Sequence, residues 1–302
     1  MPIDQRPNLF LVGAQKSGTT SLALALDSHP DVFMSRVKEP GWLAFGERGF
    51  RFLDGHGRTC RAAQWVVRSE AEYLSLFDDA PPTCRYRGEA STWYLSERGM
   101  PERLHEYNPD ARIIAILRQP ADRAYSAWVH ARRDKEEPHE DFADALAAEA
   151  DRPEPSHLLR YREMGRYVEP LRGYIERFGR DRVLILLYDD LREDFTAVFR
   201  RCCEFLQIDP DATRPVIGRH NRSGMPRSRM IHALVSSQRF KNAIRPLLPL
   251  RLASRAKQWV QSANLRRMPP IDPAIRARLT AEFADEIRAL SRLTDRNLDH
   301  WL

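Results

Sequence analysis

Short apolar runs alternate with helical patterns along the first two thirds of the chain. Apolar runs of β type predict five strands, and apolar residues at spacings of three and four predict helices between them. An alternation of this kind is typical of an α/β fold in which helices cover both faces of a parallel sheet. The predicted strands are 9–12, 32–34, 86–89, 112–117 and 182–188, and the predicted helices are 19–28, 121–133, 142–150, 168–178 and 196–206.

The last third of the chain carries a different pattern. No stretch there is a convincing strand, while 228–237 and 273–302 have the spacing of helices. Prolines interrupt the region between these two stretches. We therefore predict one domain over residues 1–302, with an α/β core at about 8–210 and a basic loop and helical extension at about 211–302.

The composition fits a globular chain with a sizeable core, since 42% of the 302 residues are hydrophobic and 30% are charged. No apolar run approaches the roughly 20 residues that a membrane-spanning helix needs. The first residues lack the long apolar stretch and cleavage site of a secretory signal, so we expect a cytoplasmic protein. The cysteines have no metal-binding spacing and are expected to be reduced thiols; they are Cys60, Cys84, Cys202 and Cys203.

Positive charge is concentrated late in the chain. Residues 212–271 contain 13 Lys and Arg and no Asp or Glu, so the rest of this +6 chain carries −7. Such a segment needs an anionic partner or a solvated surface. Its arginines match no nucleic-acid-binding motif, so we predict no nucleic-acid partner. Peripheral contact of 239–259 with acidic lipid stays open as a hypothesis.

A glycine-containing loop follows the first predicted strand. Residues 13–21 read GAQKSGTTS and lead directly into a predicted helix. Strand, loop and helix start in this order point backbone N–H groups and the positive helix end at an anion. Lys16 adds a full charge, and the hydroxyls of Thr19 and Thr20 add donors. The loop therefore predicts a site for a phosphate or sulfate group.

The loop differs from the Walker A sequence GxxxxGK[ST] of nucleotide-hydrolysing enzymes. Lys16 precedes the second glycine by two positions, and Thr19 stands in the usual place of the lysine. A metal-dependent enzyme of that class also needs an aspartate at the end of a neighbouring strand. The strand 113–117 ends instead at Arg118, a cation that suits an anion site without a metal.

The loop resembles the 5′-phosphosulfate loop of sulfotransferases that use 3′-phosphoadenosine 5′-phosphosulfate (PAPS). The segment 117–126 is similar to their 3′-phosphate motif, and the basic segment 219–229 to their late nucleotide-covering loop. The resemblance implies a P-loop-like α/β fold without a metal, with PAPS as donor and 3′-phosphoadenosine 5′-phosphate (PAP) as product. It implies these cofactor contacts: Gln15, Lys16, Ser17, Gly18, Thr19, Thr20, Arg118, Ser126, Arg222, Ser223 and Gly224.

Two further segments resemble the catalytic and acceptor parts of the family. The Lys-Glu-Pro of 38–40 is similar to the segment that supplies a glutamate base in glycan-type and many bacterial members, which makes Glu39 the expected base and Lys16 the catalytic cation. Residues 88–95 match a segment that lines the acceptor cleft, although Ala90 stands where several relatives have a lysine. The implied acceptor contacts are Trp42, Glu89, Trp93 and Tyr94.

The sequence thus predicts a cytoplasmic PAPS-dependent O-sulfotransferase. It would transfer the sulfuryl group in line to a hydroxyl of a glycan, glycolipid or small molecule, with a glutamate base and no metal. Two alternatives stay open at this point. One is a P-loop nucleotide kinase or NTPase, and the other is a protein that binds nucleic acid or membrane through residues 212–271.

Overall fold

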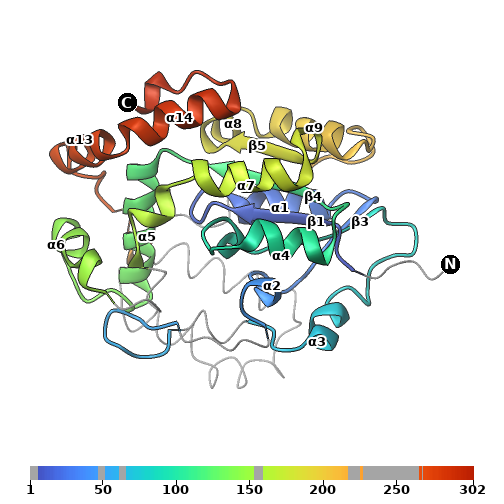
Figure 1. Cartoon of the computed structure of the whole chain (residues 1–302), viewed down its shortest axis with the longest axis horizontal. Coiled ribbons are helices and arrows are strands. Elements are labelled where there is room, and N and C mark those ends of the chain that lie inside the picture. The colour runs from blue at the N-terminus through green and yellow to red at the C-terminus, as the bar shows by residue number, and fades with distance from the viewer. Residues whose placement is uncertain are drawn as a thin grey trace.

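The computed structural model describes residues 6–46, 52–60, 66–152, 159–216 and 268–302, and the backbone of 225–226 and 265–266. At its centre is a parallel sheet in the order β2-β3-β1-β4-β5 (Figure 1). Each predicted strand is found to within one residue at either end, which confirms the α/β architecture. The strands are β1 Leu9–Gly13, β2 Val32–Met34, β3 Tyr86–Ala90, β4 Arg112–Leu117 and β5 Val183–Leu187.

Alternate residues of the central strands enter two separate apolar layers. Leu9 and Leu11 of β1 pack in one layer, and Phe10 and Val12 pack in the other, because successive side chains of a strand point to opposite faces. Two helices cover the first face and two others lie side by side across the second (Figure 1). They are α1 Thr19–Asp27 and α9 Phe195–Leu206, then α4 Met100–Tyr107 and α7 Val168–Phe178.

Helix α5 Pro120–Arg133 begins three residues after β4. Pro120 occupies its first turn, as predicted, and the side chain of Gln119 accepts a hydrogen bond from the Asp122 N–H at 2.8 Å. Helix α6 Phe142–Ala147 is shorter than predicted, since a 3₁₀ turn at Ala148–Asp151 takes over its last part. Four helices were not predicted: α4, described above, and the shorter α2 Trp42–Phe45, α3 Glu70–Ser75 and α8 Tyr188–Glu193.

The C-terminal region is more broken than its sequence pattern predicts. The expected helical stretch 273–302 consists of α13 Pro273–Glu282, α14 Ala284–Thr294 and a final 3₁₀ turn at Asp299–Trp301. The prediction of no strand after 210 was wrong, because β6 Met225–Pro226 pairs antiparallel with β7 Leu265–Arg266. Strands of two residues are too short to produce a periodic pattern. The predicted helix at 228–237 lies outside the described residues.

The C-terminal helices are fastened to the sheet edge at which the strands end. Helix α13 packs on α5 and α14 packs on α7 (Figure 1). The Gln119 amide donates to the Thr280 hydroxyl at 3.0 Å and to the Trp301 carbonyl at 3.2 Å. The Trp301 indole N–H donates to Asp189 at 2.7 Å, and Arg296 binds Asp190 with both arms of its guanidinium. These bonds fix the start of α5 and the segment after β5.

All four cysteines are free and buried, which confirms the expectation of reduced thiols. Within the described ranges, every helix is too short or too polar to cross a bilayer.

Replacing Trp301 by alanine should lower the free energy of unfolding by about 3–5 kcal/mol, because the ring is 1% exposed and its removal leaves a cavity. Urea denaturation followed by circular dichroism measures this loss. Leu302→Ala is the control, since Leu302 is 44% exposed and its truncation should change stability little. If the two variants were equally stable, the inference that buried Trp301 holds the C-terminal region on the sheet would be wrong.

Candidate functional site

The carboxyl ends of the five strands form one edge, where ligands of open parallel sheets bind. After β1 the chain runs outward to β2 and returns through β3, whereas β4 and β5 follow on the other side of β1. The connections on the two sides of β1 therefore lead away from each other, which leaves an opening for a ligand at the edge beside β1. The loop after β1, the segments after β2 and β3, and Arg118 after β4 all lie at this edge.

The loop between β1 and α1 has a backbone held for anion binding. The Ala14 N–H donates to the Ile116 carbonyl of β4 at 2.7 Å, which ties the loop to the neighbouring strand. Gly18 caps α1 with φ at 93°, and no side chain caps the first N–H groups of the helix. A Cβ at Gly18 would lie 2.7 Å from Leu191, so only glycine fits both the angle and the space. The helix start is therefore available to a negatively charged group.

Two buried polar atoms of the loop lack hydrogen-bond partners among the described residues. They are the Ser17 hydroxyl and the side-chain oxygen of Gln15. A buried hydroxyl without a partner is costly, and an anion at the loop would accept its proton. The residues present thus fit a phosphate or phosphosulfate group. Thr19 is buried beside them, and Thr20 is partly exposed.

Arg118 braces the loop from the end of β4. Its guanidinium donates to the Lys16 carbonyl at 3.1 Å and lies over the Tyr188 ring at 4.9 Å. The Tyr167 hydroxyl donates to the Arg118 carbonyl at 3.0 Å. Held in this way, the side chain places a permanent positive charge next to the loop.

Several cations act on Lys16 at once. Burial, together with the charges of Arg133, Lys38 and Arg118, lowers the pKa of Lys16 to about 7. Asp134 opposes them only in part. A bound anion would relieve this repulsion and favour the charged amine.

Helix α5 contributes two residues that the sequence analysis missed. His130 and Arg133 share a helix face with the predicted Ser126, since they follow it by four and seven positions. Burial, and then the charge of Lys16, lower the pKa of His130 to about 3, so this imidazole is neutral. Their spacing from Ser126 is the signal that could have found them. Ser126 itself is buried.

Glu39 lies where the segment after β2 meets the end of β3. Its backbone has φ at 60°, and its N–H donates to the Ala90 carbonyl at 3.0 Å. The carboxylate accepts from the Thr92 N–H at 2.6 Å and lies 3.3 Å from the Lys38 amine. Because 24% of its side chain is exposed, this carboxylate can reach a bound molecule.

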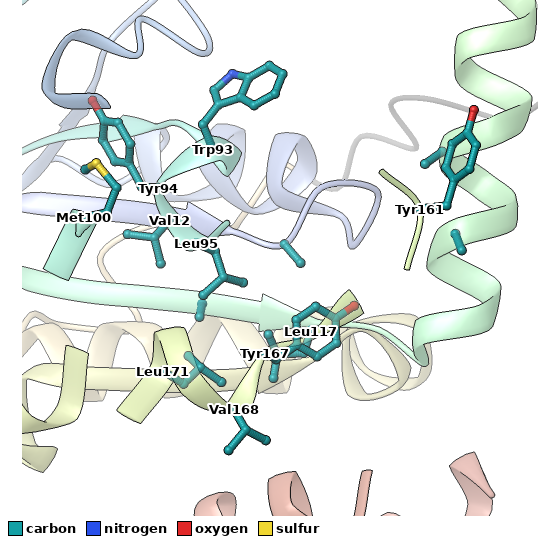
Figure 2. Close-up of a cluster of buried hydrophobic side chains, with 14 of the residues drawn as sticks. Val12, Trp93, Tyr94, Leu95, Met100, Leu117, Tyr161, Tyr167, Val168 and Leu171 are labelled. Atoms are coloured by element: carbon teal, nitrogen blue, oxygen red, sulfur yellow. The ribbon is translucent and has the colours of Figure 1, made fainter. Parts of the chain in front are cut away.

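Three of the four predicted acceptor contacts are enclosed. Glu89 is 0% exposed, Trp93 4% and Tyr94 1%, and Figure 2 shows Tyr94 beside Val12 and Met100 in the apolar cluster. In this structure the side chains of Glu89, Trp93 and Tyr94 lie in the protein interior and do not line the carboxyl edge of the sheet. Aromatic residues in a protein core are the commoner case. Trp42 is partly exposed and is the one of the four that can still contact an acceptor.

The predicted nucleotide-covering residues Arg222, Ser223 and Gly224 lie outside the described residues. Strand β6 begins directly after them and contacts α5. The Tyr125 hydroxyl of α5 donates to the Pro269 carbonyl at 2.9 Å. Strand β6 and Pro269, two described parts of residues 212–271, therefore lie against the helix that carries Ser126.

Arg123, which also lies in the segment 117–126, is fully buried in α5 and donates to the Tyr161 carbonyl. Within the described ranges, no group of three His, Cys, Asp or Glu side chains is arranged to hold a metal ion.

A model of the sulfotransferase domain matches residues 6–223, which include the loop, Glu39 and helix α5. The chain belongs to the sulfotransferase family. This sulfotransferase is 28% identical over 215 residues to the bifunctional heparan sulfate N-deacetylase/N-sulfotransferase 1 of Mus musculus. The match covers 68% of the present chain and 22% of the mouse protein, so the chain spans about a fifth of that relative.

Solved structures agree with this assignment. A crystal structure of a sulfotransferase from Alicyclobacillus acidocaldarius is 30% identical, covers 98% of each chain and superposes with a TM-score of 0.74. The mouse sulfotransferase SULT7A1, crystallised with PAP, is 16% identical with a TM-score of 0.50 and covers 96% of this chain and 88% of its own. The second comparison shows the shared fold, and the predicted membership of the sulfotransferase family is confirmed.

Proposed function

We propose that the protein transfers the sulfuryl group of PAPS to an acceptor hydroxyl, with Glu39 as general base and without a metal ion. One observation carries the proposal: Lys38 links the two halves of the site. Its charge acts on Lys16 in the anion-binding loop, and its amine lies 3.3 Å from the Glu39 carboxylate. An anion-binding group and an accessible base therefore share one edge of the sheet.

The donor half uses the chain's own cations and N–H groups. The start of α1, the Ser17 hydroxyl and Lys16 would hold the 5′ end of the nucleotide, and Arg118 with Ser126 would hold its 3′-phosphate. When bound, PAPS supplies an activated sulfuryl group. Lys16 would offset the negative charge that collects on the departing phosphate, and Arg222, Ser223 and Gly224 would cover the nucleotide.

The acceptor half centres on Glu39. Two hydrogen bonds from Thr92, one from its N–H and one from its hydroxyl, fix the carboxylate and leave it lone pairs for the acceptor proton. Such a base removes the proton as the new bond to sulfur forms. Lys38 places a positive charge 3.3 Å from the carboxylate, and Trp42 would offer a ring face to the acceptor.

Sugars fit the acceptor role. Hydroxyl-bearing glycans and glycolipids are the acceptors that we propose, and the matched mouse relative is named as a heparan sulfate N-sulfotransferase. A screen with PAPS should therefore pair each hydroxyl sugar with the corresponding amino sugar. If only the amino sugars were sulfated, the acceptor group would be an amine and not the proposed hydroxyl. The proposed donor site would stand unchanged.

Calorimetry should show that PAP binds without Mg²⁺ and that Arg118→Ala weakens this binding at least tenfold, because a guanidinium fork on phosphate is lost. Arg112→Ala is the matched control. Arg112 lies at the other end of β4, donates to the Asp181 carbonyl at 2.7 Å and lies over the Phe205 ring at 5.3 Å. Preference for ATP with Mg²⁺ would favour a nucleotide kinase instead.

PAP affinity should fall as the pH rises from 7 to 9, by up to about tenfold per unit. The pKa of Lys16 is about 7 in the free protein, so the amine is largely neutral above this pH. A bound anion raises that pKa, and binding must therefore take up a proton. Titrations in buffers of different ionisation enthalpy count this proton. In Lys16→Met the uptake should vanish; if it persists, another group is responsible.

Glu39→Gln should lower kcat about 10²–10⁴-fold and leave PAP affinity within twofold, because the amide cannot accept the acceptor proton. The release of PAP from PAPS measures kcat with any acceptor found in the screen. Glu70→Gln, an exposed carboxylate on α3, is the control and should keep full activity. Full activity of the Glu39 variant would remove it from the mechanism.

A further inference from the structure

Beneath the catalytic edge, the carboxylate of Glu89 is enclosed by hydroxyl groups. Its Oε1 accepts from the Tyr73 hydroxyl at 2.5 Å and from the Tyr94 hydroxyl at 2.7 Å. Its Oε2 accepts from the Ser91 hydroxyl at 2.5 Å. The side chain is completely buried, so these three groups take the place of water around it.

Two of these hydroxyls also hold the segment that carries Glu39. The Gly41 N–H donates to the Ser91 oxygen at 3.2 Å, and the Leu43 N–H donates to the Tyr94 oxygen at 3.2 Å. We call residues 39–43 the base segment. Besides these two bonds, the base segment is tied to β3 by the bond from the Glu39 N–H to the Ala90 carbonyl.

The direction of the protons follows from the number each group carries. A hydroxyl has a single proton, and an ionised carboxylate can only accept. Glu89 therefore draws the protons of Ser91 and Tyr94 toward itself, which leaves their oxygens facing the N–H groups of Gly41 and Leu43. With a neutral side chain at position 89, the hydroxyls lose this fixed orientation.

We propose that Glu89 is a positioning residue that holds the base segment in place through the hydroxyls of Ser91 and Tyr94. The catalytic part of this inference rests on the proposed function, because it takes Glu39 as the base. Glu89 itself is enclosed and touches neither donor nor acceptor. Its effect reaches the reaction only through the placement of the Glu39 backbone and side chain.

Because Glu89 can be ionised or protonated, the placement of the base segment depends on pH. Burial raises its pKa to about 7, against the lowering effect of the hydrogen bonds from Ser91, Tyr73 and Tyr94, and the charge of Glu39 also raises it. The Tyr174 hydroxyl of α7 donates to the Tyr94 carbonyl at 2.7 Å, and burial, together with the charge of Glu89, raises its pKa and keeps it neutral. Below about pH 7 Glu89 takes up a proton, and its new O–H competes with the three hydroxyl protons.

Amide hydrogen exchange tests the positioning without any substrate. At pH 8, Glu89→Gln should make the amides of Gly41 and Leu43 exchange at least tenfold faster, and Ser91→Ala should do so for Gly41. Ser91→Ala removes one hydroxyl only and serves if the Gln variant fails to fold. The control is Tyr161→Phe, which removes a bond of 2.7 Å to another buried carboxylate, that of Glu137. The inference would be overturned if the Gly41 amide exchanged at the wild-type rate in Glu89→Gln, or in Ser91→Ala where the Gln variant does not fold.

Kinetics test the catalytic consequence. With saturating PAPS and water as acceptor at pH 8, the sulfur–oxygen bond to the phosphate breaks as one to water forms, giving PAP, sulfate and two protons. Glu89→Gln should lower kcat at least tenfold and leave PAP affinity unchanged. Tyr73 makes no hydrogen bond to the base segment in this structure, and Tyr73→Phe keeps the ring that lies 6.3 Å from the Trp42 ring. The variant removes only a donor to the carboxylate, so it should move the acid limb of kcat to higher pH.

The two failures are distinguishable. If the wild type releases no PAP from PAPS and does not bind PAP, the proposed function fails, whatever the exchange rates are. If the wild type is active and Glu89→Gln keeps its kcat and its pH profile, Glu89 does not position the base.

Discussion

Repulsion among cations at the carboxyl edge of the sheet is the constraint on which the site depends. Lys16, Lys38, Arg118 and Arg133 lie close enough to depress the pKa of the lysine in the loop. Such an arrangement is stable only because its backbone is fixed, by the bond from Ala14 to β4 and by the capped start of α5. Binding of an anion relieves this repulsion, so the edge is already arranged for negative charge.

The sequence was sufficient to predict the sheet and the position of the loop. Apolar runs such as 112–117 are buried on both faces of the sheet, and a buried parallel strand has few other interpretations. The end of that run at Arg118 then placed a cation at the edge. The helices α2, α3, α4 and α8 were not predicted. Three of them have four to six residues, which do not complete two helical turns, and α4 Met100–Tyr107 is only slightly longer.

The candidate site was harder to predict than the fold, because contacts across the chain decide which polar side chains are exposed. Trp93 and Tyr94 look like a wall for a ring-shaped acceptor, yet Trp93 stacks on Phe52 and Tyr94 packs beside Phe10 of β1 in the core. Tyr73 lies 16 positions before Glu89, and no local pattern pairs the two. By contrast, His130 could have been found from its spacing to Ser126 on one helix face.

The attachment of the C-terminal helices has a consequence for the order in which parts of the protein fold during synthesis. Gln119, which caps α5, completes its hydrogen bonds with Trp301, 182 positions further along the chain. During synthesis the sheet and the loop leave the ribosome long before this partner does. The nascent chain therefore forms its core early, but the helix that bears Ser126 gains its final support only after Trp301 has emerged.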